Sequence, residues 1–340
     1  MNVFADYLGH SDLYYSLHLL FEKRLKANLF RPIGPEWSEK GFLNPPSVDP
    51  AEEATPLNLA EVNQTDDIHY IPVKMELEDG YYTHKAITFS QFLRMDFDLI
   101  VTTFFEHERI FHKVLKRYKP NTAFIRQIGN IHEKPLGFCK NILLAQLTPM
   151  PPNVNYVIYH PEHYEGYCYT PPTNHNTVNN FANHLPSYPY DLDTWNKCES
   201  SLRGFTFKMY GTDGRDGPVP HLLMPQAMRD SAFVWHVKAQ GGGGFVARQA
   251  LASGRPCIIK KKYAVWHDEL AKELFVDSVN CIDLDLGVER GIEKIREWSQ
   301  PDSHIEVCKA TAEKFKRDIN FADEAERIKE WINNLRRRQN

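Results

Sequence analysis

Four consecutive glycines at 241–244 constrain this chain more than any other feature, because of the segments on either side of them. The apolar residues 232–235 before them predict a short buried strand. Residues 245–253 have helical spacing, and residues 256–259 have the apolar pattern of a second strand. Together these segments predict one βαβ unit. Its helix begins at the glycine loop and offers free backbone N–H groups to an anion.

The glycine loop is therefore predicted to bind a phosphate group, since a residue without Cβ lets a phosphate come close to the backbone. Gly242, Gly243 and Gly244 would supply N–H groups to it. Lys238, between the strand and the glycines, would neutralise its charge. His236 stands two residues before Lys238 and would share its side of the strand end.

Length and composition describe an ordinary globular protein of two domains: 340 residues, 42% hydrophobic and 25% charged. The net charge of −4 argues against a general nucleic-acid-binding protein and leaves room for a local basic patch. Six cysteines without a CxxC pair indicate reduced thiols. With neither a signal peptide nor an apolar run of about 20 residues, we expect a cytoplasmic protein with no membrane span.

Strand-like and helix-like segments alternate along the chain, which predicts an α/β protein with mostly parallel, doubly wound sheets. We expect two facing Rossmann-like domains, at residues 1–185 and 186–318, followed by a C-terminal helix within 319–340. Residues 161–195 are rich in Pro, Tyr, Asn and His, and are interpreted as the crossing between the domains.

Two other phosphate-binding motifs fit poorly. A nicotinamide site would need a third glycine where Val246 stands, and an acid after the second strand, where Lys260–Lys262 stand instead. A P-loop is excluded, since the chain has no GxxxxGK[ST].

Three segments carry a resemblance to a known family. The glycine loop with its helix and the pattern Gln249–Pro256 resemble the C-terminal half of GT-B-fold glycosyltransferases. The strand at 205–210 and the turn Gly211–Gly217 resemble the opening of the nucleotide-binding domain of that family. Gly9 and His10, after the first strand, are similar to the start of inverting GT-B enzymes.

The resemblance implies a metal-independent enzyme that moves a sugar from a nucleotide-diphosphate sugar, with UDP-sugar the expected donor, to an acceptor hydroxyl. Domain 186–318 would hold the donor and domain 1–185 the acceptor. His10 would deprotonate the acceptor hydroxyl with help from Asp12. Lys238, His236 and the glycine loop would hold the departing diphosphate. The remaining candidates divide into donor nucleoside or sugar ligands (Tyr210, Arg215, Gln249, Glu269) and acceptor ligands (Glu106, His107, Arg109).

The stereochemistry follows from two departures from the family pattern. Many retaining members have Glu where this chain has Gln249, and a second Glu where it has Gly241. Glutamine can still hydrogen-bond a ribose diol but brings no charge. The missing acids favour inversion.

Two alternatives remain open at this point: a nucleotide-sugar epimerase of the same fold, and a non-catalytic module that binds a sugar nucleotide or a glycan. The acceptor is also open, since a glycan, a lipid, a small molecule, a protein or a modified base of phage DNA would each fit. Neither the sugar nor the oligomeric state follows from the sequence.

Overall fold

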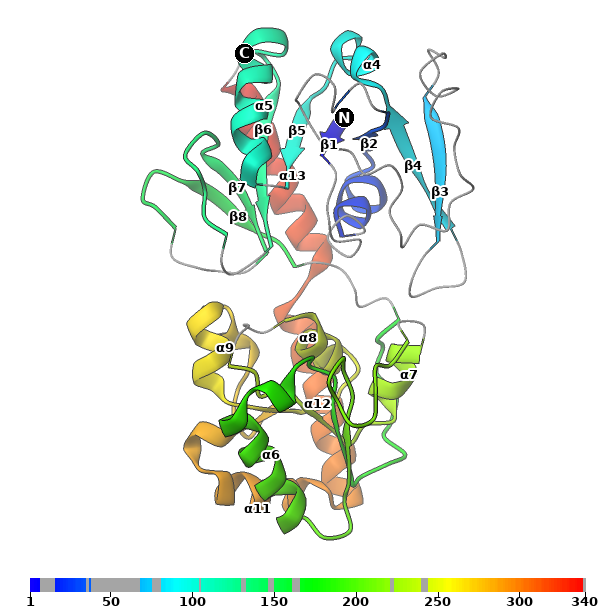
Figure 1. Ribbon diagram of the computed structural model, residues 1–340, viewed down its shortest axis with the longest axis vertical. Coiled ribbons are helices and arrows are strands. Elements are labelled where there is room, and N and C mark those ends of the chain that lie inside the picture. The colour runs from blue at the N-terminus through cyan, green and yellow to red at the C-terminus, as the bar shows by residue number, and fades with distance from the viewer. Residues whose placement is uncertain are drawn as a thin grey trace. The chain divides into compact units, whose positions relative to one another are not determined.

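The chain folds into two units in the computed structural model (Figure 1). Unit 1 comprises Met1–Ala145, Pro149–Glu162 and Phe321–Asn340, and unit 2 comprises Gln146–Thr148 and His163–Asn320. The structure describes residues 1–6, 16–34, 37, 68–74, 81–103, 105–129, 133–145, 150–160, 166–220, 223–239 and 244–338. His10, Asp12, Gly242 and Gly243 lie outside these ranges.

Unit 1 is built on one sheet with the strand order β3-β4-β2-β1-β5-β6-β7-β8. Every neighbouring pair is parallel except β3 with β4. The strands are β1 (Asn2–Ala5), β2 (Asn28–Pro32), β3 (His69–Lys74), β4 (Tyr81–Ile87), β5 (Leu99–Thr102), β6 (Ala123–Ile128), β7 (Asn141–Leu144) and β8 (Asn155–Ile158). Because β1 has β2 on one side and β5 on the other, the topological switch point lies between β1 and β5.

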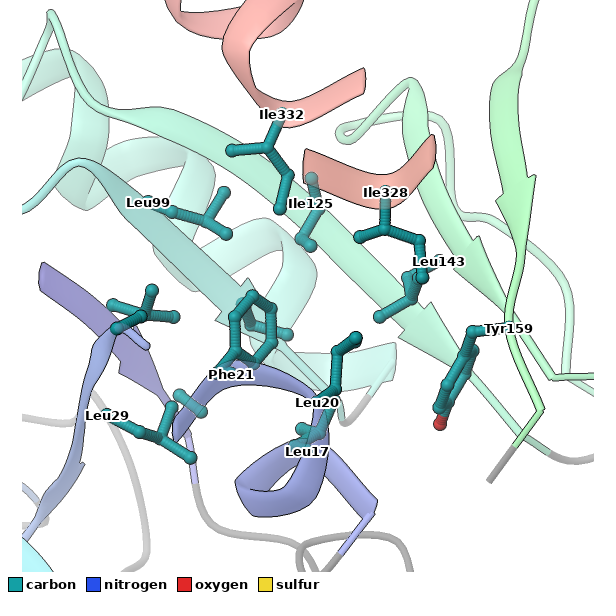
Figure 2. Close-up of a cluster of buried hydrophobic side chains, with 14 of the residues drawn as sticks. Leu17, Leu20, Phe21, Leu29, Leu99, Ile125, Leu143, Tyr159, Ile328 and Ile332 are labelled. Carbon is teal, nitrogen blue, oxygen red and sulfur yellow. The ribbon is translucent and has the colours of Figure 1, made fainter. Parts of the chain in front are cut away.

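Helices cover both faces of this sheet. The helices are the π-helix η1 (Leu19–Arg24), α4 (Phe89–Arg94), α5 (Phe105–Tyr118) and α13 (Phe321–Arg337). Alternate strand residues point to opposite faces. Leu99 and Ile125 therefore pack with Ile328 and Ile332 of α13 and Phe21 of η1, as Figure 2 shows. The intervening strand residues (Phe4, Ile100, Phe124) pack against α4 and α5.

Unit 2 is built on a five-stranded sheet with the order β10-β9-β11-β12-β13, in which all pairs are parallel. Its strands are β9 (Thr177–Asn180), β10 (Thr206–Met209), β11 (Phe233–Trp235), β12 (Cys257–Ile259) and β13 (Cys281–Asp283). Its helices are η2 (Leu185–Ser187), α6 (Pro189–Ser201), α7 (Met224–Arg229), α8 (Phe245–Ala252), α9 (Lys261–His267), α10 (Ala271–Leu274), η4 (Leu284–Leu286), α11 (Val288–Trp298) and α12 (Pro301–Asp318). The strand order reverses between β9 and β11, which is the switch point of this unit.

The sequence-based prediction of a parallel α/β protein is confirmed. The βαβ unit around the glycines forms as β11, α8 and β12, with ends that differ from the predicted ones by one residue. The predicted C-terminal helix forms as α13. It packs on unit 1, where Ile328 and Ile332 are fully buried, rather than on unit 2, which precedes it in sequence.

The division between the units differs from the expected one. It falls near residue 163 rather than at 185, because the segment expected to be a crossing contains the buried strand β9. Two asparagines of β9, Asn179 and Asn180, give this strand a polar sequence although it is buried. Asn179 Nδ2 donates to Ser231 Oγ at 2.8 Å, and Asn180 Nδ2 donates to the carbonyl of Tyr210 at 3.1 Å. Buried amides are tolerated when they are hydrogen-bonded in this way.

Candidate functional site

The carboxyl edge of the unit 2 sheet, at the switch point between β9 and β11, is where ligands bind in open α/β sheets. Lys238 lies three residues beyond the end of β11 and is half-buried. Burial lowers the pKa of its ammonium group. Among the described residues, no hydrogen-bond or ion-pair partner contacts that group. A half-buried cation without a partner is an incomplete electrostatic arrangement that an anion would complete.

Helix α8 begins after the glycines that follow this lysine in sequence, as predicted. Gly244 is its N-cap, with φ −55° and ψ 177°, and no side chain caps the helix. The first N–H groups of a helix have no partner within it and lie at the positive end of its dipole. Gln249 lies further along the same helix and is buried. His236 is also buried, and its backbone N–H donates to the Ile258 carbonyl at 2.8 Å.

An aromatic pair lies at the carboxyl ends of the two neighbouring strands. Phe181 follows β9, Tyr210 follows β10, and their rings stack with centroids 5.3 Å apart and an interplanar angle of 16°. The turn after Tyr210 is tightly folded, because a Cβ on Gly214 would stand 2.1 Å from the Met209 carbonyl oxygen. The tight turn therefore constrains the backbone that carries Tyr210.

Arg215 of the same turn is engaged within the fold. Its guanidinium forms an ion pair with Glu199, with one Nη1–Oε2 distance of 3.1 Å, and donates to the Phe207 carbonyl at 2.8 Å. The hydrogen bond that Arg215 donates to the Glu199 carboxylate raises the pKa of the guanidinium. This arginine thus braces the turn against α6, and its role toward the donor nucleotide stays a prediction from the sequence.

Glu269 is exposed in the turn between α9 and α10. The residue before it, Asp268, is fully buried and forms an ion pair with Arg248 of α8 at 2.9 Å. Asp268 Oδ1 also accepts the Leu270 N–H at 3.1 Å. A buried ion pair therefore joins the helix that follows the glycine loop to the turn that carries Glu269.

The other switch point, in unit 1, brings together residues far apart in sequence. Asp6 follows β1 and is fully buried. Its carboxylate accepts hydrogen bonds from the Thr102 hydroxyl at 2.5 Å, the Thr103 N–H at 2.7 Å and the Thr103 hydroxyl at 2.6 Å. Nδ1 of His107, from the first turn of α5, lies 3.0 Å from Asp6 Oδ2.

Two of the three predicted acceptor ligands, His107 and Arg109, lie on different faces of α5. His107 lies at the switch point against Asp6. Arg109 is exposed on another face of α5, as two residues along a helix dictate. Glu106 belongs to α5, but its side chain is outside the described part of the structure.

Two residues of this edge were missed by the sequence-based reasoning. Asp6 is one; its only signal was a lone acid directly after an apolar strand. Arg126 of β6 is the other, which pairs in register with Thr102 and so points to the same face. Its side chain is buried, with Nη2 2.9 Å from Glu133 Oε2, while Nε and Nη1 lack a partner among the described residues.

Metal ligands are sparse around these sites. Within the described ranges, no group of three or more His, Cys, Asp and Glu side chains could hold a metal ion. No helix in the same ranges is long and apolar enough to cross a membrane.

Comparison with known proteins identifies the fold. No protein-family model and no curated protein matches this chain. Among solved structures, an alpha-glucosyltransferase (AGT) in complex with UDP is similar, with a TM-score of 0.61, 9% identity, and coverage of 98% of this chain and 100% of that one. HepE of Anabaena in complex with UDP-glucose has a TM-score of 0.59 and 12% identity over 98% and 100% of the two chains. An alpha-glucosyltransferase in complex with UDP and a 13-mer DNA containing an HMU base has a TM-score of 0.61 and 11% identity over 98% and 99%.

These likenesses extend over nearly the whole chain, whereas the sequences have diverged almost completely. They establish that this chain has the GT-B fold of glycosyltransferases, with two Rossmann-like domains. The resemblance found in the sequence is confirmed at the level of the fold.

Proposed function

We propose that this protein is a glycosyltransferase that moves a sugar from a UDP-sugar to an acceptor hydroxyl, with the donor bound by unit 2 and the acceptor by unit 1. One observation carries the proposal: the half-buried Lys238 at the switch point of unit 2, six residues before the N-cap of α8, has no hydrogen-bond or ion-pair partner among the described residues. The GT-B fold supports the same assignment.

The donor diphosphate would occupy the position between Lys238 and α8. Negative charge on the diphosphate grows as the bond to the sugar breaks, so a cation and helix N–H groups at this position favour the transition state over the ground state. Gly244, the N-cap of α8, is the one glycine of the predicted phosphate-binding loop that the structure describes. Gly242 and Gly243 remain sequence-based candidates. The loss of the leaving group is thus assisted by electrostatics without a metal ion.

The nucleoside would lie further along the same edge. The stacked rings of Phe181 and Tyr210 offer an aromatic surface to a flat base. The Gln249 amide provides both a donor and an acceptor for ribose hydroxyls, which is the role implied for it by the family resemblance. Glu269, exposed beside Asp268, is retained as a candidate for the donor sugar.

The acceptor side centres on His107. With Asp6 at Nδ1, the neutral imidazole carries its proton on Nδ1, which makes Nε2 the basic nitrogen. A histidine held in this way can orient an acceptor hydroxyl or remove its proton. His10, assisted by Asp12, stays the sequence-based prediction for the base of an inverting transfer.

The test is donor consumption with UDP-glucose and other UDP-sugars, with and without a panel of acceptors that includes glycans, small alcohols and DNA with hydroxymethylated bases. We expect acceptor-dependent UDP release that persists in EDTA. Lys238→Ala should weaken donor binding and slow transfer, whereas Lys316→Ala, which changes an exposed lysine of α12, should do neither. Equal effects of the two variants would contradict the donor site.

The same assay separates the alternatives. An epimerase would convert the UDP-sugar without any acceptor, and a non-catalytic module would bind UDP-sugar with no turnover. The anomeric configuration of the product, read by NMR, tests inversion: a β-linked product from an α-linked donor requires it, and an α-linked product refutes it. His10→Ala and His107→Ala then distinguish the two candidate bases. Only replacement of the true base should slow transfer by about 100-fold or more while donor binding stays intact.

A further inference from the structure

Helix α5 has an outward face made of cations. Arg109, Lys113, Lys116 and Arg117 are all exposed, and their spacing of four, three and one residues places them along one side of the helix. The opposite side is apolar and packs into the core. The helix is therefore anchored by its apolar side and presents its charged side to solvent.

A loop of unit 1 is fixed beside this face. The carboxylate of Glu108, on the first turn of α5, accepts hydrogen bonds from the backbone N–H groups of Leu136 at 3.1 Å and Cys139 at 2.7 Å. One helical turn further on, the ring of His112 lies 5.6 Å from the ring of Phe138. The loop 133–140 thus lies along the helix in a defined position.

The tip of this loop is apolar and projects into solvent. Leu136 is 47% exposed and Phe138 is 40% exposed. Gly137 between them has φ +87°, and nothing lies within 4 Å of where its Cβ would be. Exposed lysines, Lys134 and Lys140, stand on either side of the tip.

The six cations of this surface lack carboxylate partners among the described residues, and none has an ion pair. Some exposed lysines elsewhere in the chain are paired, as Lys309 is with Glu313 and Lys329 with Glu326. The one acid of α5 with a described side chain, Glu108, is buried and holds the loop. In a chain of net charge −4, the remainder of the molecule is therefore markedly acidic and this surface stands apart from it.

We propose that this surface, formed by the cations of α5 and the loop 133–140, binds an anionic lipid membrane from one side. The cations would contact lipid headgroups, and Leu136 and Phe138 would enter the boundary between headgroups and acyl chains. The apolar tip favours a membrane over a nucleic acid, because a phosphate backbone offers no apolar partner to an exposed leucine. Membrane binding by charge plus apolar insertion does not depend on the proposed sugar transfer.

The experiment is cosedimentation of the full chain with vesicles of equimolar phosphatidylglycerol and phosphatidylcholine, and with vesicles of phosphatidylcholine alone. We expect binding only to the anionic vesicles, and weaker binding as salt is raised. Each lysine near such a surface contributes about fivefold in partitioning, so Lys113→Gln with Lys116→Gln should lower binding by more than tenfold. Lys309→Gln with Lys329→Gln removes the same charge elsewhere and should leave binding unchanged.

Phe138→Ser tests insertion, since it removes an apolar group and no charge. We expect it to reduce vesicle binding several-fold at unchanged thermal stability. The proposal is overturned if the two lysine pairs behave alike, or if the chain binds phosphatidylcholine as well as it binds the anionic vesicles. It is equally overturned if Phe138→Ser has no effect and the α5 variant loses binding to duplex DNA instead, which would identify a polyanion site.

Discussion

The substitution Lys238→Met separates a ligand-binding role from a structural one. Burial lowers the pKa of this ammonium group, so its charged form is less favourable in the folded protein than in the unfolded chain. Methionine keeps the length of the side chain and removes the charge. We therefore expect the free variant to be as stable as the parent protein or more stable, while its affinity for UDP falls.

The size of the effect follows from the bond that is lost. A hydrogen bond to a charged group contributes about 1.5–3 kcal/mol, so its loss weakens UDP binding by about 10- to 150-fold. UDP at about 100 times its dissociation constant stabilises the parent protein by about 2.7 kcal/mol. At the same concentration it should stabilise the variant by only about 0.3–1.4 kcal/mol.

Thermal unfolding of both proteins, with and without UDP, is the assay. A stabilisation of 1 kcal/mol raises the melting temperature of a protein this large by about 2–4 °C, so the loss of ligand response is measurable. A full UDP response in Lys238→Met would refute the diphosphate site. Loss of stability in the free variant would instead mean that Lys238 has an internal partner and a structural role.

Three further perturbations test the fold. Gly254→Ala should destabilise the protein by about 2–4 kcal/mol, because φ is +71° and the new Cβ would stand 2.5 Å from a ring carbon of Tyr169. Gly217 has a similar φ of +73° but open space around its Cβ position, so Gly217→Ala should cost about half as much. Thermal unfolding measures both losses. Asp268→Ala leaves the buried guanidinium of Arg248 unpaired and should cost about 3–5 kcal/mol in denaturant unfolding. Burial lowers the pKa of His304 from 6.5 to about 4. As pH falls from 6.5 to 4 the unfolded chain therefore binds a proton that the folded protein does not, and the free energy of unfolding falls by about 3 kcal/mol. His304→Gln should make the free energy of unfolding less dependent on pH in this range.

The elements that the sequence predicted well have strong local signals. The apolar runs 232–235 and 256–259 and the glycines between them specify β11, α8 and β12 from neighbouring residues alone. Strand β9 has no such signal, because half of its residues are asparagines. Its burial depends on partners such as Ser231 and Tyr210, which only the folded sheet brings near.

The same distinction governs the candidate sites. The place of Lys238 between a buried strand and helix α8 could be predicted because those elements are consecutive in sequence, whereas its role stays a prediction. The contact of His107 with Asp6 could not, since 101 residues separate them and the pairing of β1 with β5 brings them together. The hydrogen bond of Arg215 with Glu199 of α6 could not be predicted either, although the turn that carries Arg215 has a local sequence motif.

The position of a candidate residue relative to the switch point separates Asp6 and Lys238 from the other charged residues. Asp6 directly follows β1 and Lys238 comes three residues after β11, so both lie at the carboxyl ends of strands at a switch point, where open α/β sheets bind their ligands. Away from the switch point, charged side chains can form ion pairs within the fold, as Lys260 Nζ does with Asp191 Oδ1 at 2.8 Å. A polar residue just beyond an apolar strand therefore indicates a ligand site only when that strand lies at the switch. Strand order, which depends on long-range pairing, is thus the information that a local pattern lacks.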